Sequence, residues 1–138
     1  MSSANLSITK TEAEWQKELS PETFHVMREH GTERAGTSGL LKEHRTGLYH
    51  CAACHLPLFQ SETKYNSGTG WPSFFRALPQ AVATTVDKSY GMTRTEVHCA
   101  RCGGHLGHVF PDGPKPTSER YCMNGVALKF APGPASSS

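Results

Sequence analysis

Five cysteines carry the strongest chemical signal in the sequence, and their spacing divides them into two groups. Four of them form two Cys-x-x-Cys pairs, Cys51 with Cys54 and Cys99 with Cys102, each followed by small or turn-forming residues. Two such pairs on separate hairpins can bring four thiolates to a tetrahedron around Zn²⁺, with zinc–sulfur bonds of about 2.3 Å. A cage closed by four thiolates has no open position, so the spacing predicts a structural zinc site.

Two alternatives to zinc use the same four cysteines: two disulfides, or two redox-active pairs like that of thioredoxin. A compartment that keeps thiols reduced disfavours disulfides, and neither pair lies in the βαβ context that a thioredoxin-like pair requires. Iron in the same cage is a further alternative. We therefore interpret the two pairs as zinc ligands.

The fifth cysteine, Cys122, lies outside both pairs, with Arg120 two residues before it and Asn124 two residues after it. Side chains two apart on a strand point to the same face, so a cation and an amide flank the thiol. Such neighbours favour the thiolate, which is the reactive form of cysteine. An inert cysteine in the core is the alternative. Because the metal accounts for the other four cysteines, we interpret Cys122 as a nucleophile.

Two histidines, His105 and His108, follow the second cysteine pair closely, so a bound metal would fix their position. An imidazole can transfer a proton near neutral pH, which makes both residues candidates for a general acid beside Cys122. Such a pair is also common at protein surfaces and in metal sites, so a second metal site stays open. Asp112 begins an Asp-Gly-Pro turn, where it either orients one imidazole or forms only an Asx turn.

An aromatic loop at residues 68–75, Gly-Thr-Gly-Trp-Pro-Ser-Phe-Phe, supplies an indole and two phenyl rings. Rings of this kind hold a methyl group or a thioether through apolar and sulfur–aromatic contacts. Trp71, between a glycine and a proline, is the candidate for an exposed pocket wall. Phe74 is a second candidate for substrate contact, although both phenylalanines can equally belong to a core cluster.

The elements that must position these residues begin with two short helices. Thr11 with Glu14 forms a capping box for the first helix, and Ser20 before Pro21 predicts the start of a second, which ends at Gly31. We expect Trp15 to pack the helical pair onto a sheet rather than to contact a ligand. From residue 46 the pattern becomes that of short strands between turn residues, at 48–50, 82–85, 92–98, 107–110 and 120–130.

Length and composition indicate one domain with a modest core, since the chain has 138 residues and a net charge of +2. We expect a flexible N-terminus at 1–10, one domain at 11–130 and a disordered tail at 131–138, which holds only Ala, Pro, Gly and Ser. No charge run calls for nucleic acid or an anionic membrane, and no apolar run approaches the roughly 20 residues of a membrane helix. Because no secretory leader is visible, we expect a cytoplasmic protein. We also expect it to be a monomer.

Taken in order, these segments resemble the zinc-containing methionine-R-sulfoxide reductases of the MsrB type. The resemblance extends from about residue 11 to residue 130, nearly the whole chain, and the ordered set is far more specific than any single motif. The matching pieces are Cys51-x-x-Cys54, Pro57-Leu58-Phe59, Gly70-Trp71-Pro72-Ser73-Phe74, Cys99-x-x-Cys102, His105-Leu106-Gly107-His108-Val109-Phe110, Asp112-Gly113-Pro114 and Arg120-Tyr121-Cys122-x-Asn124.

The resemblance implies a mainly β fold of two twisted antiparallel sheets, with short N-terminal helices and a structural Zn²⁺. It implies reduction of the R epimer of methionine sulfoxide, free or in oxidised proteins, to methionine. Cys122 is then the nucleophile, and Trp71 packs on the methyl group of the substrate. The other residues implied to line the site are His105, His108, Asp112, Arg120 and Asn124.

One departure from the family concerns the reductant. Many members carry a second, recycling cysteine where this chain has Thr69. With the other four cysteines assigned to the metal, we expect an external thiol to reduce the sulfenic acid of Cys122: thioredoxin, glutaredoxin with glutathione, or a small thiol. The rival functions are a non-catalytic zinc-ribbon-like binding module and a peroxide-reducing or sulfenate-sensing thiol protein.

Overall fold

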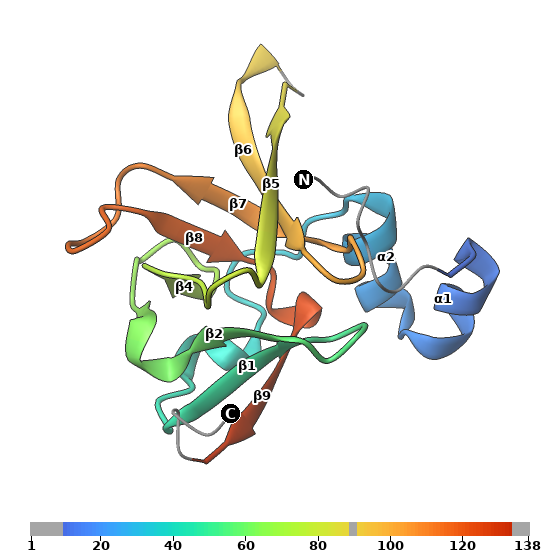
Figure 1. Cartoon of the computed structure of the whole chain (residues 1–138), viewed down its shortest axis with the longest axis horizontal. Helices are drawn as coiled ribbons and strands as arrows, with labels where there is room; N and C mark the ends of the chain where they lie inside the picture. The colour runs from blue at the N-terminus through green and yellow to red at the C-terminus, as the bar shows by residue number, and fades with distance from the viewer. Residues whose placement is uncertain (1–9, 89–90, 134–138) are drawn as a thin grey trace.

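The computed structural model describes residues 10–88 and 91–133, which form two antiparallel sheets with two short helices at one side (Figure 1). Both sheets are antiparallel throughout, which confirms the predicted fold class. The three-stranded sheet has the order β2 (Pro57–Gln60), β1 (Gly47–Cys51), β9 (Leu128–Pro132). The six-stranded sheet has the order β3 (Lys64–Tyr65), β4 (Ser73–Phe74), β8 (Arg120–Met123), β7 (His105–Phe110), β6 (Arg94–Cys99), β5 (Val82–Asp87).

The helices begin where the capping residues predict. In α1 (Glu12–Glu18), the Thr11 side chain accepts from the backbone N–H of Glu14, whose carboxylate accepts from the N–H of Thr11, so the capping box is confirmed. In α2 (Pro21–Glu29), Ser20 caps the first turn, and the helix packs against β7. Three 3₁₀ turns complete the described elements: η2 (Gly39–Lys42), η3 (Ser61–Thr63) and η5 (Gly125–Ala127).

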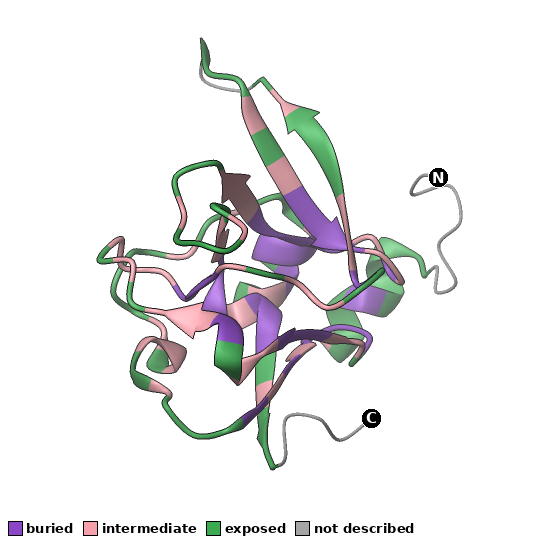
Figure 2. Ribbon diagram, turned by 60° about the vertical axis from the view of Figure 1, so that its left-hand side comes forward, coloured by how far each residue is buried: buried purple, intermediate pink, exposed green. Residues whose placement is uncertain are grey.

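The core is a continuous apolar cluster between the sheets and beneath α2, where the buried residues concentrate (Figure 2). Trp15 is 1% exposed, which confirms its predicted packing role. Between the sheets, the ring of Phe74 stacks on Phe59 with 4.3 Å between centroids and meets Tyr49 edge-on at 5.0 Å. These rings hold β4 of one sheet against β1 and β2 of the other.

The predicted strand at 120–130 is wrong as one element, because the chain changes sheets within it. Strand β8 ends at Met123, and the next residue, Asn124, caps the start of the η5 turn. The carbonyl of Asn124 accepts a hydrogen bond from the N–H of Ala127 at 3.0 Å. Strand β9 then runs in the three-stranded sheet beside β1. The strand that carries Cys122 therefore ends one residue after it, at a turn that joins the two sheets.

The predicted flexible ends fall mostly outside the described residues, which exclude 1–9 and 134–138. Lys10 forms an ion pair with Glu18 at 2.6 Å. The predicted tail begins too early, because residues 131 and 132 belong to β9 and pair with β1. Among the described helices, none is long and apolar enough to cross a membrane.

Candidate active site and metal centre

The four paired cysteines come together at the junction of the two sheets. Cys51 is the last residue of β1 and Cys99 is the last residue of β6, so each Cys-x-x-Cys turn follows a strand of a different sheet. The Sγ atoms of Cys51 and Cys102 are 3.7 Å apart, those of Cys54 and Cys99 are 3.5 Å apart, and all four lie within 4.8 Å of one another. A tetrahedron with zinc–sulfur bonds of about 2.3 Å has edges of about 3.8 Å, so the four sulfurs fit that ion.

Contacts among the four cage thiols shift their pKa values in opposite directions. All four cysteines are free and buried, which excludes the disulfide alternative in this structure. Hydrogen bonds led by that with Cys102 lower the pKa of both Cys54 and Cys99. Hydrogen bonding within the cluster and burial raise the pKa of Cys51 and of Cys102. The backbone N–H of Arg101 also donates to the Cys99 sulfur at 3.4 Å. Negative sulfurs sealed from water need a cation, so the donor chemistry fits a metal ion.

The fifth cysteine, Cys122, lies at the middle of β8, between β4 on one side and β7 on the other. Its register partners are Ser73 on β4 and His108 on β7. Directly opposite residues on antiparallel strands have Cβ atoms about 4.5–5.5 Å apart, so thiol and imidazole are neighbours. Both face a cavity of about 170 Å³, which is lined by Thr32, Thr69, Trp71, Arg94, Gly107, His108, Phe110, Arg120, Cys122 and Asn124.

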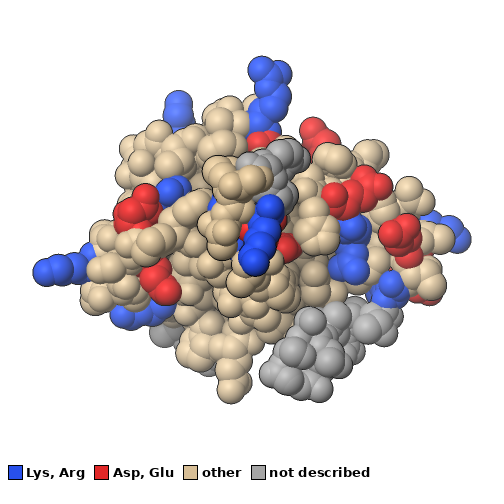
Figure 3. All heavy atoms as spheres, turned by 90° about the horizontal axis from the view of Figure 1, so that it is seen from above, with Lys and Arg blue, Asp and Glu red and all other residues tan. Residues whose placement is uncertain are grey.

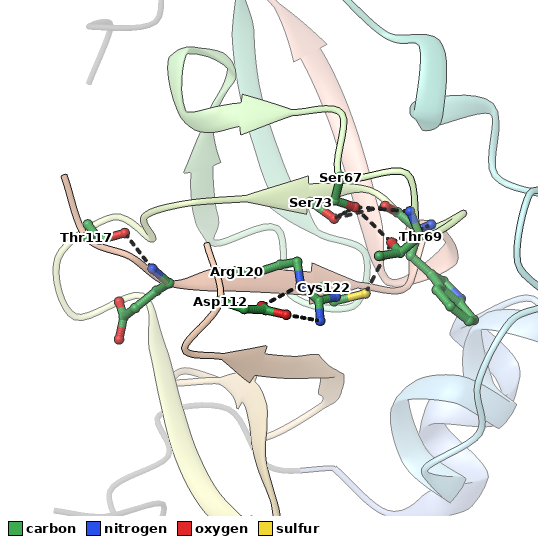
Figure 4. A network of polar contacts seen from close by, with 9 residues as sticks. Ser67, Thr69, Ser73, Asp112, Thr117, Arg120 and Cys122 are labelled. Carbon is green, nitrogen blue, oxygen red and sulfur yellow. Dashed lines mark hydrogen bonds and ion pairs between the residues drawn. The ribbon is translucent and has the colours of Figure 1, made fainter. Parts of the chain in front are cut away.

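The thiol has one close hydroxyl partner. The Thr69 Oγ1 atom lies 3.9 Å from the Cys122 sulfur, at one end of a hydroxyl chain drawn in Figure 4. Ser67 contacts Thr69 at 2.8 Å and Ser73 at 2.7 Å. The chain of hydroxyls fixes the Thr69 side chain against the sulfur.

Burial dominates the acidity of Cys122. Loss of water raises the pKa of this thiol, while the hydrogen bond from Thr69 and the positive charge of Arg120 lower it without cancelling the burial effect. The expectation that the neighbours keep the free thiol anionic is therefore wrong, although Arg120 acts in the predicted direction. Burial therefore favours the protonated thiol over the thiolate in the free protein.

Arg120 is held beside the thiol by two partners. Its guanidinium donates to both carboxylate oxygens of Asp112, at 2.8 and 3.2 Å (Figure 4). The guanidinium also lies over the Phe110 ring, 4.3 Å from its centroid. Asp112 thus orients the arginine and not an imidazole, because the turn carries it to the β8 side of the site. The hydrogen bond from Arg120 in turn lowers the pKa of Asp112.

Each histidine of the predicted pair has a carboxylate partner that sequence reasoning missed. The His108 ring lies 2.8 Å from Asp87, at the end of β5, and burial lowers its pKa against the opposing effect of that carboxylate. The His105 ring lies 2.7 Å from Glu96, on β6. Glu96 lies within the predicted strand at 92–98 and His105 just after it in the sequence, whereas nothing local marks Asp87.

The loop after α2 positions two predicted site residues. The Trp71 indole N–H donates to the carbonyl of Glu33 at 3.0 Å, and the Asn124 side-chain oxygen accepts from the N–H of Glu33 at 2.9 Å. The Asn124 amide nitrogen donates to the carbonyl of Leu106 at 3.1 Å. Both ends of the Asn124 amide therefore bind backbone, and its role is to hold the loop and strand together beside the cavity. The amide predicted to flank the thiol is therefore directed to backbone groups and not to the sulfur.

Comparison with known proteins matches the chain over nearly its whole length. The SelR domain profile matches residues 19–132. The peptide methionine sulfoxide reductase MsrB of Thiobacillus denitrificans is 56% identical over 124 residues, covering 89% of this chain and 94% of that protein. The protein of the same name in Agrobacterium fabrum is 53% identical over 126 residues, 91% and 93% of the two chains. The chain belongs to the MsrB family.

A mammalian relative shows how widely this MsrB sequence pattern extends. Methionine-R-sulfoxide reductase B2, mitochondrial, of Rattus norvegicus is 51% identical over 137 residues, covering 94% of this chain and 78% of that protein. The resemblance read from the ordered motifs is confirmed.

Three residues predicted for the MsrB site, Phe74, His105 and Asp112, do not line the cavity of Cys122. Phe74 is fully buried in the aromatic cluster between the sheets, so its predicted contact with substrate is wrong and the core alternative holds. Strand alternation explains this, since its neighbour Ser73 is the residue paired with Cys122. His105 is 3% exposed and lies behind His108, with 5.5 Å between ring centroids.

Proposed function

We propose that this protein reduces the R epimer of methionine sulfoxide, free or within proteins, to methionine, with Cys122 as nucleophile and an external thiol as final reductant. One observation carries this proposal: Cys122 lies outside the metal cage, directly opposite His108, in a cavity with an indole wall. The family membership of the chain supports the same activity.

The cavity suits a small sulfoxide bearing a methyl group. Trp71 and Phe110 supply apolar wall, and His108 and Arg120 supply polar groups to the same lining. The hydrogen bond from the Trp71 indole N–H to the carbonyl of Glu33 fixes the plane of the indole ring. A methyl group against the indole and an oxygen toward the imidazole define two of the substituents on a chiral sulfur, so the cavity accepts one epimer.

The chemical step joins attack on sulfur to protonation of oxygen. The Cys122 sulfur attacks the sulfoxide sulfur, and His108 is placed to deliver the proton that turns the oxygen into a leaving group. The protonated oxygen leaves as water, and a bond between the Cys122 sulfur and the substrate sulfur remains. A water molecule then attacks the Cys122 sulfur, the bond between the two sulfurs breaks, methionine leaves, and Cys122 is left as a sulfenic acid. Overall, one thiol and one sulfoxide give one sulfenic acid and one thioether, so atoms and electrons balance.

The acidities found for the two partners determine how the proton moves. Burial raises the pKa of Cys122 and lowers that of His108, so the resting pair is a neutral thiol beside a neutral imidazole. The pair holds a single transferable proton. Its passage from Cys122 to His108 creates the nucleophile and the acid together, and Asp87 stabilises the imidazolium that results.

An external thiol completes the cycle, because Thr69 occupies the position nearest the sulfur and the other cysteines belong to the cage. A first thiol displaces water from the sulfenic acid and forms a mixed disulfide. A second thiol then releases Cys122 and leaves as the disulfide of the reductant. Thioredoxin, glutaredoxin with glutathione and small thiols are the candidate reductants.

We propose that the cage holds a structural Zn²⁺ through Cys51, Cys54, Cys99 and Cys102. When bound, the ion neutralises thiolate charge and supplies no open coordination position for substrate. The cysteines themselves tie the end of β1 to the end of β6, which links the two sheets. His105 follows the second pair and begins β7, so the tie also fixes the strand that carries His108.

The surface fits a small or peptide substrate better than nucleic acid. On the face shown in Figure 3, lysines and arginines are interspersed with aspartates and glutamates. With a net charge of +2, mixed charges of this kind give no extended basic stripe on that face.

The test compares three substrates with dithiothreitol as reductant: methionine-R-sulfoxide, methionine-S-sulfoxide and hydrogen peroxide. We expect turnover of the R epimer alone, and none by Cys122→Ser, whose circular dichroism spectrum and metal content should match the wild type. A binding module without catalysis would turn over none of the three. A peroxide-reducing thiol protein would consume hydrogen peroxide faster than either epimer.

A further inference from the structure

A second cluster of metal-ligating side chains lies behind the proposed active site. His30, Glu96 and His105 each offer one ligand atom, and these atoms all lie within 4.8 Å of one another. The His105 Nδ1 atom is 2.7 Å from Glu96 Oε2, and the His30 Nε2 atom is 3.2 Å from the same oxygen. The two imidazole rings are 5.2 Å apart between centroids.

We propose that these three side chains bind a divalent transition-metal ion such as Zn²⁺, as a site separate from the four-cysteine cage. Two imidazoles and one carboxylate form a donor set that first-row metals favour. For bonds of about 2.0–2.1 Å, ligand atoms of a tetrahedral site lie about 3.4 Å apart, close to the 3.2 Å between Glu96 and His30. The 2.7 Å between Glu96 and His105 is a hydrogen-bond distance, which lengthens when an ion replaces the shared proton. Three protein ligands leave a position for water.

The backbone turns His30 toward the sheet. His30 follows the last residue of α2 in the left-handed conformation, with φ 57° and ψ 37°, while the N–H of Gly31 closes the helix on His25. This conformation favours glycine or asparagine over histidine. The side chain of His30 is 66% exposed, whereas that of Glu96 is 13% exposed and that of His105 is 3% exposed. The site therefore has a buried base and one ligand that reaches it from solvent.

The cavity at this cluster has room and charge for a cation. It measures about 340 Å³, and its lining includes the carboxylates of Glu29, Asp87 and Glu96 with a single guanidinium, that of Arg94. Arg94 donates to Asp87 at 3.1 Å, which offsets one of the three negative charges. Histidines in their neutral form add lone pairs and no opposing charge, so the described groups favour a divalent ion there.

The competing interpretation is that His30, Glu96 and His105 only form hydrogen bonds with one another and bind no metal. The number of zinc ions bound per chain distinguishes the two interpretations. The experiment dialyses the full chain, with its cage already loaded, against increasing free Zn²⁺ and counts bound zinc per chain. We expect two equivalents for the wild type and one for His30→Gly. His30→Gly suits the left-handed backbone, so its melting temperature should not fall.

A matched control removes an exposed histidine from the same helix. His25 lies 3.1 Å from Glu29 and has 62% of its side chain exposed, but it belongs to a pair and not to a trio. His25→Ala should still bind two equivalents. Glu96→Gln keeps the shape of the central ligand without its charge and should raise the dissociation constant of the second zinc by more than about tenfold.

The inference is overturned if the wild type binds one zinc only, or if His30→Gly binds the second zinc as tightly as His25→Ala does. Should His30→Gly fail to fold, His30→Asn also accepts the backbone conformation and answers the same question. Zinc counting uses no sulfoxide and no reductant, so its outcome is independent of the proposed activity.

Discussion

Replacing Thr69 by valine tests how the acidity of the nucleophile is set. Valine keeps the branched shape and removes the hydroxyl that lies 3.9 Å from the Cys122 sulfur. That hydroxyl is the largest of the influences that lower the pKa of Cys122 against the effect of burial. Its removal should therefore raise the pKa of the thiol further.

The contact geometry limits the size of the effect. A hydrogen bond to a charged group contributes about 1.5–3 kcal/mol, and a contact as long as this one belongs at the lower end. At about 1.4 kcal/mol per pKa unit, we expect the pKa of Cys122 to rise by about one unit. The thiolate fraction near neutral pH then falls about tenfold. A more basic thiolate is also more nucleophilic, with a Brønsted coefficient of about 0.4–0.5, so kcat/KM should fall only about threefold.

The assay is the rate of Cys122 alkylation by iodoacetamide as a function of pH, alongside kcat/KM for methionine-R-sulfoxide. The cage cysteines, kept loaded with metal, do not compete for the reagent. Thr69→Ser is the matched control, since it retains the hydroxyl and should keep the wild-type pKa. An unchanged or lower pKa in Thr69→Val would refute this reasoning, because burial would then act on the thiol without opposition from the hydroxyl.

Four further outcomes follow from the same structure. As a function of pH, kcat/KM should be constant between the lowered pKa of His108 and the raised pKa of Cys122. Below this pH range a second proton binds the pair and neutralises the thiolate, and above it the pair has no proton to give to the sulfoxide oxygen. A sharp maximum at a single pH would contradict this. His108→Asn should lower kcat by about 10²–10⁴-fold while alkylation of Cys122 continues; loss of both would indicate a folding defect. Cys99→Ser should release the metal, measured by metal analysis, and lower the melting temperature, measured by calorimetry. A variant that keeps both its metal and the wild-type melting temperature would show that Cys99 is not a ligand of a structural metal. Phe74→Ala should lower the free energy of unfolding, measured with denaturant, by about 3–5 kcal/mol, while the KM of the folded fraction stays unchanged. A raised KM with wild-type stability would indicate that Phe74 contacts the substrate.

The features that the sequence predicted well are those that depend on short spacings. Helix starts follow from Thr11 with Glu14 and from Ser20 with Pro21, because capping bonds join residues only three apart. The four cage ligands follow from two short pairs. Cys122 stands out because no partner is within two or three residues of it in the chain.

The features that were missed depend on how distant strands meet. Asp87 reaches His108 only because β5 and β7 both flank β6, and nothing local to Asp87 marks that topology. The sequence does not reveal that the chain changes sheets after Met123, because the strand-like pattern of apolar residues continues on both sides of Asn124. The raised pKa of Cys122 likewise depends on burial by neighbouring strands, which a flanking arginine does not reveal.

The most direct test of the central claim is a single turnover without reductant. Protein with its metal bound is mixed with excess methionine-R-sulfoxide, methionine is counted, and dimedone traps sulfenic acid for peptide mass analysis. We predict one methionine per chain, with the dimedone adduct on Cys122 and all four cage cysteines unmodified. Methionine formed while Cys122 stays unmodified, or a disulfide between Cys122 and a cage cysteine, would contradict the account.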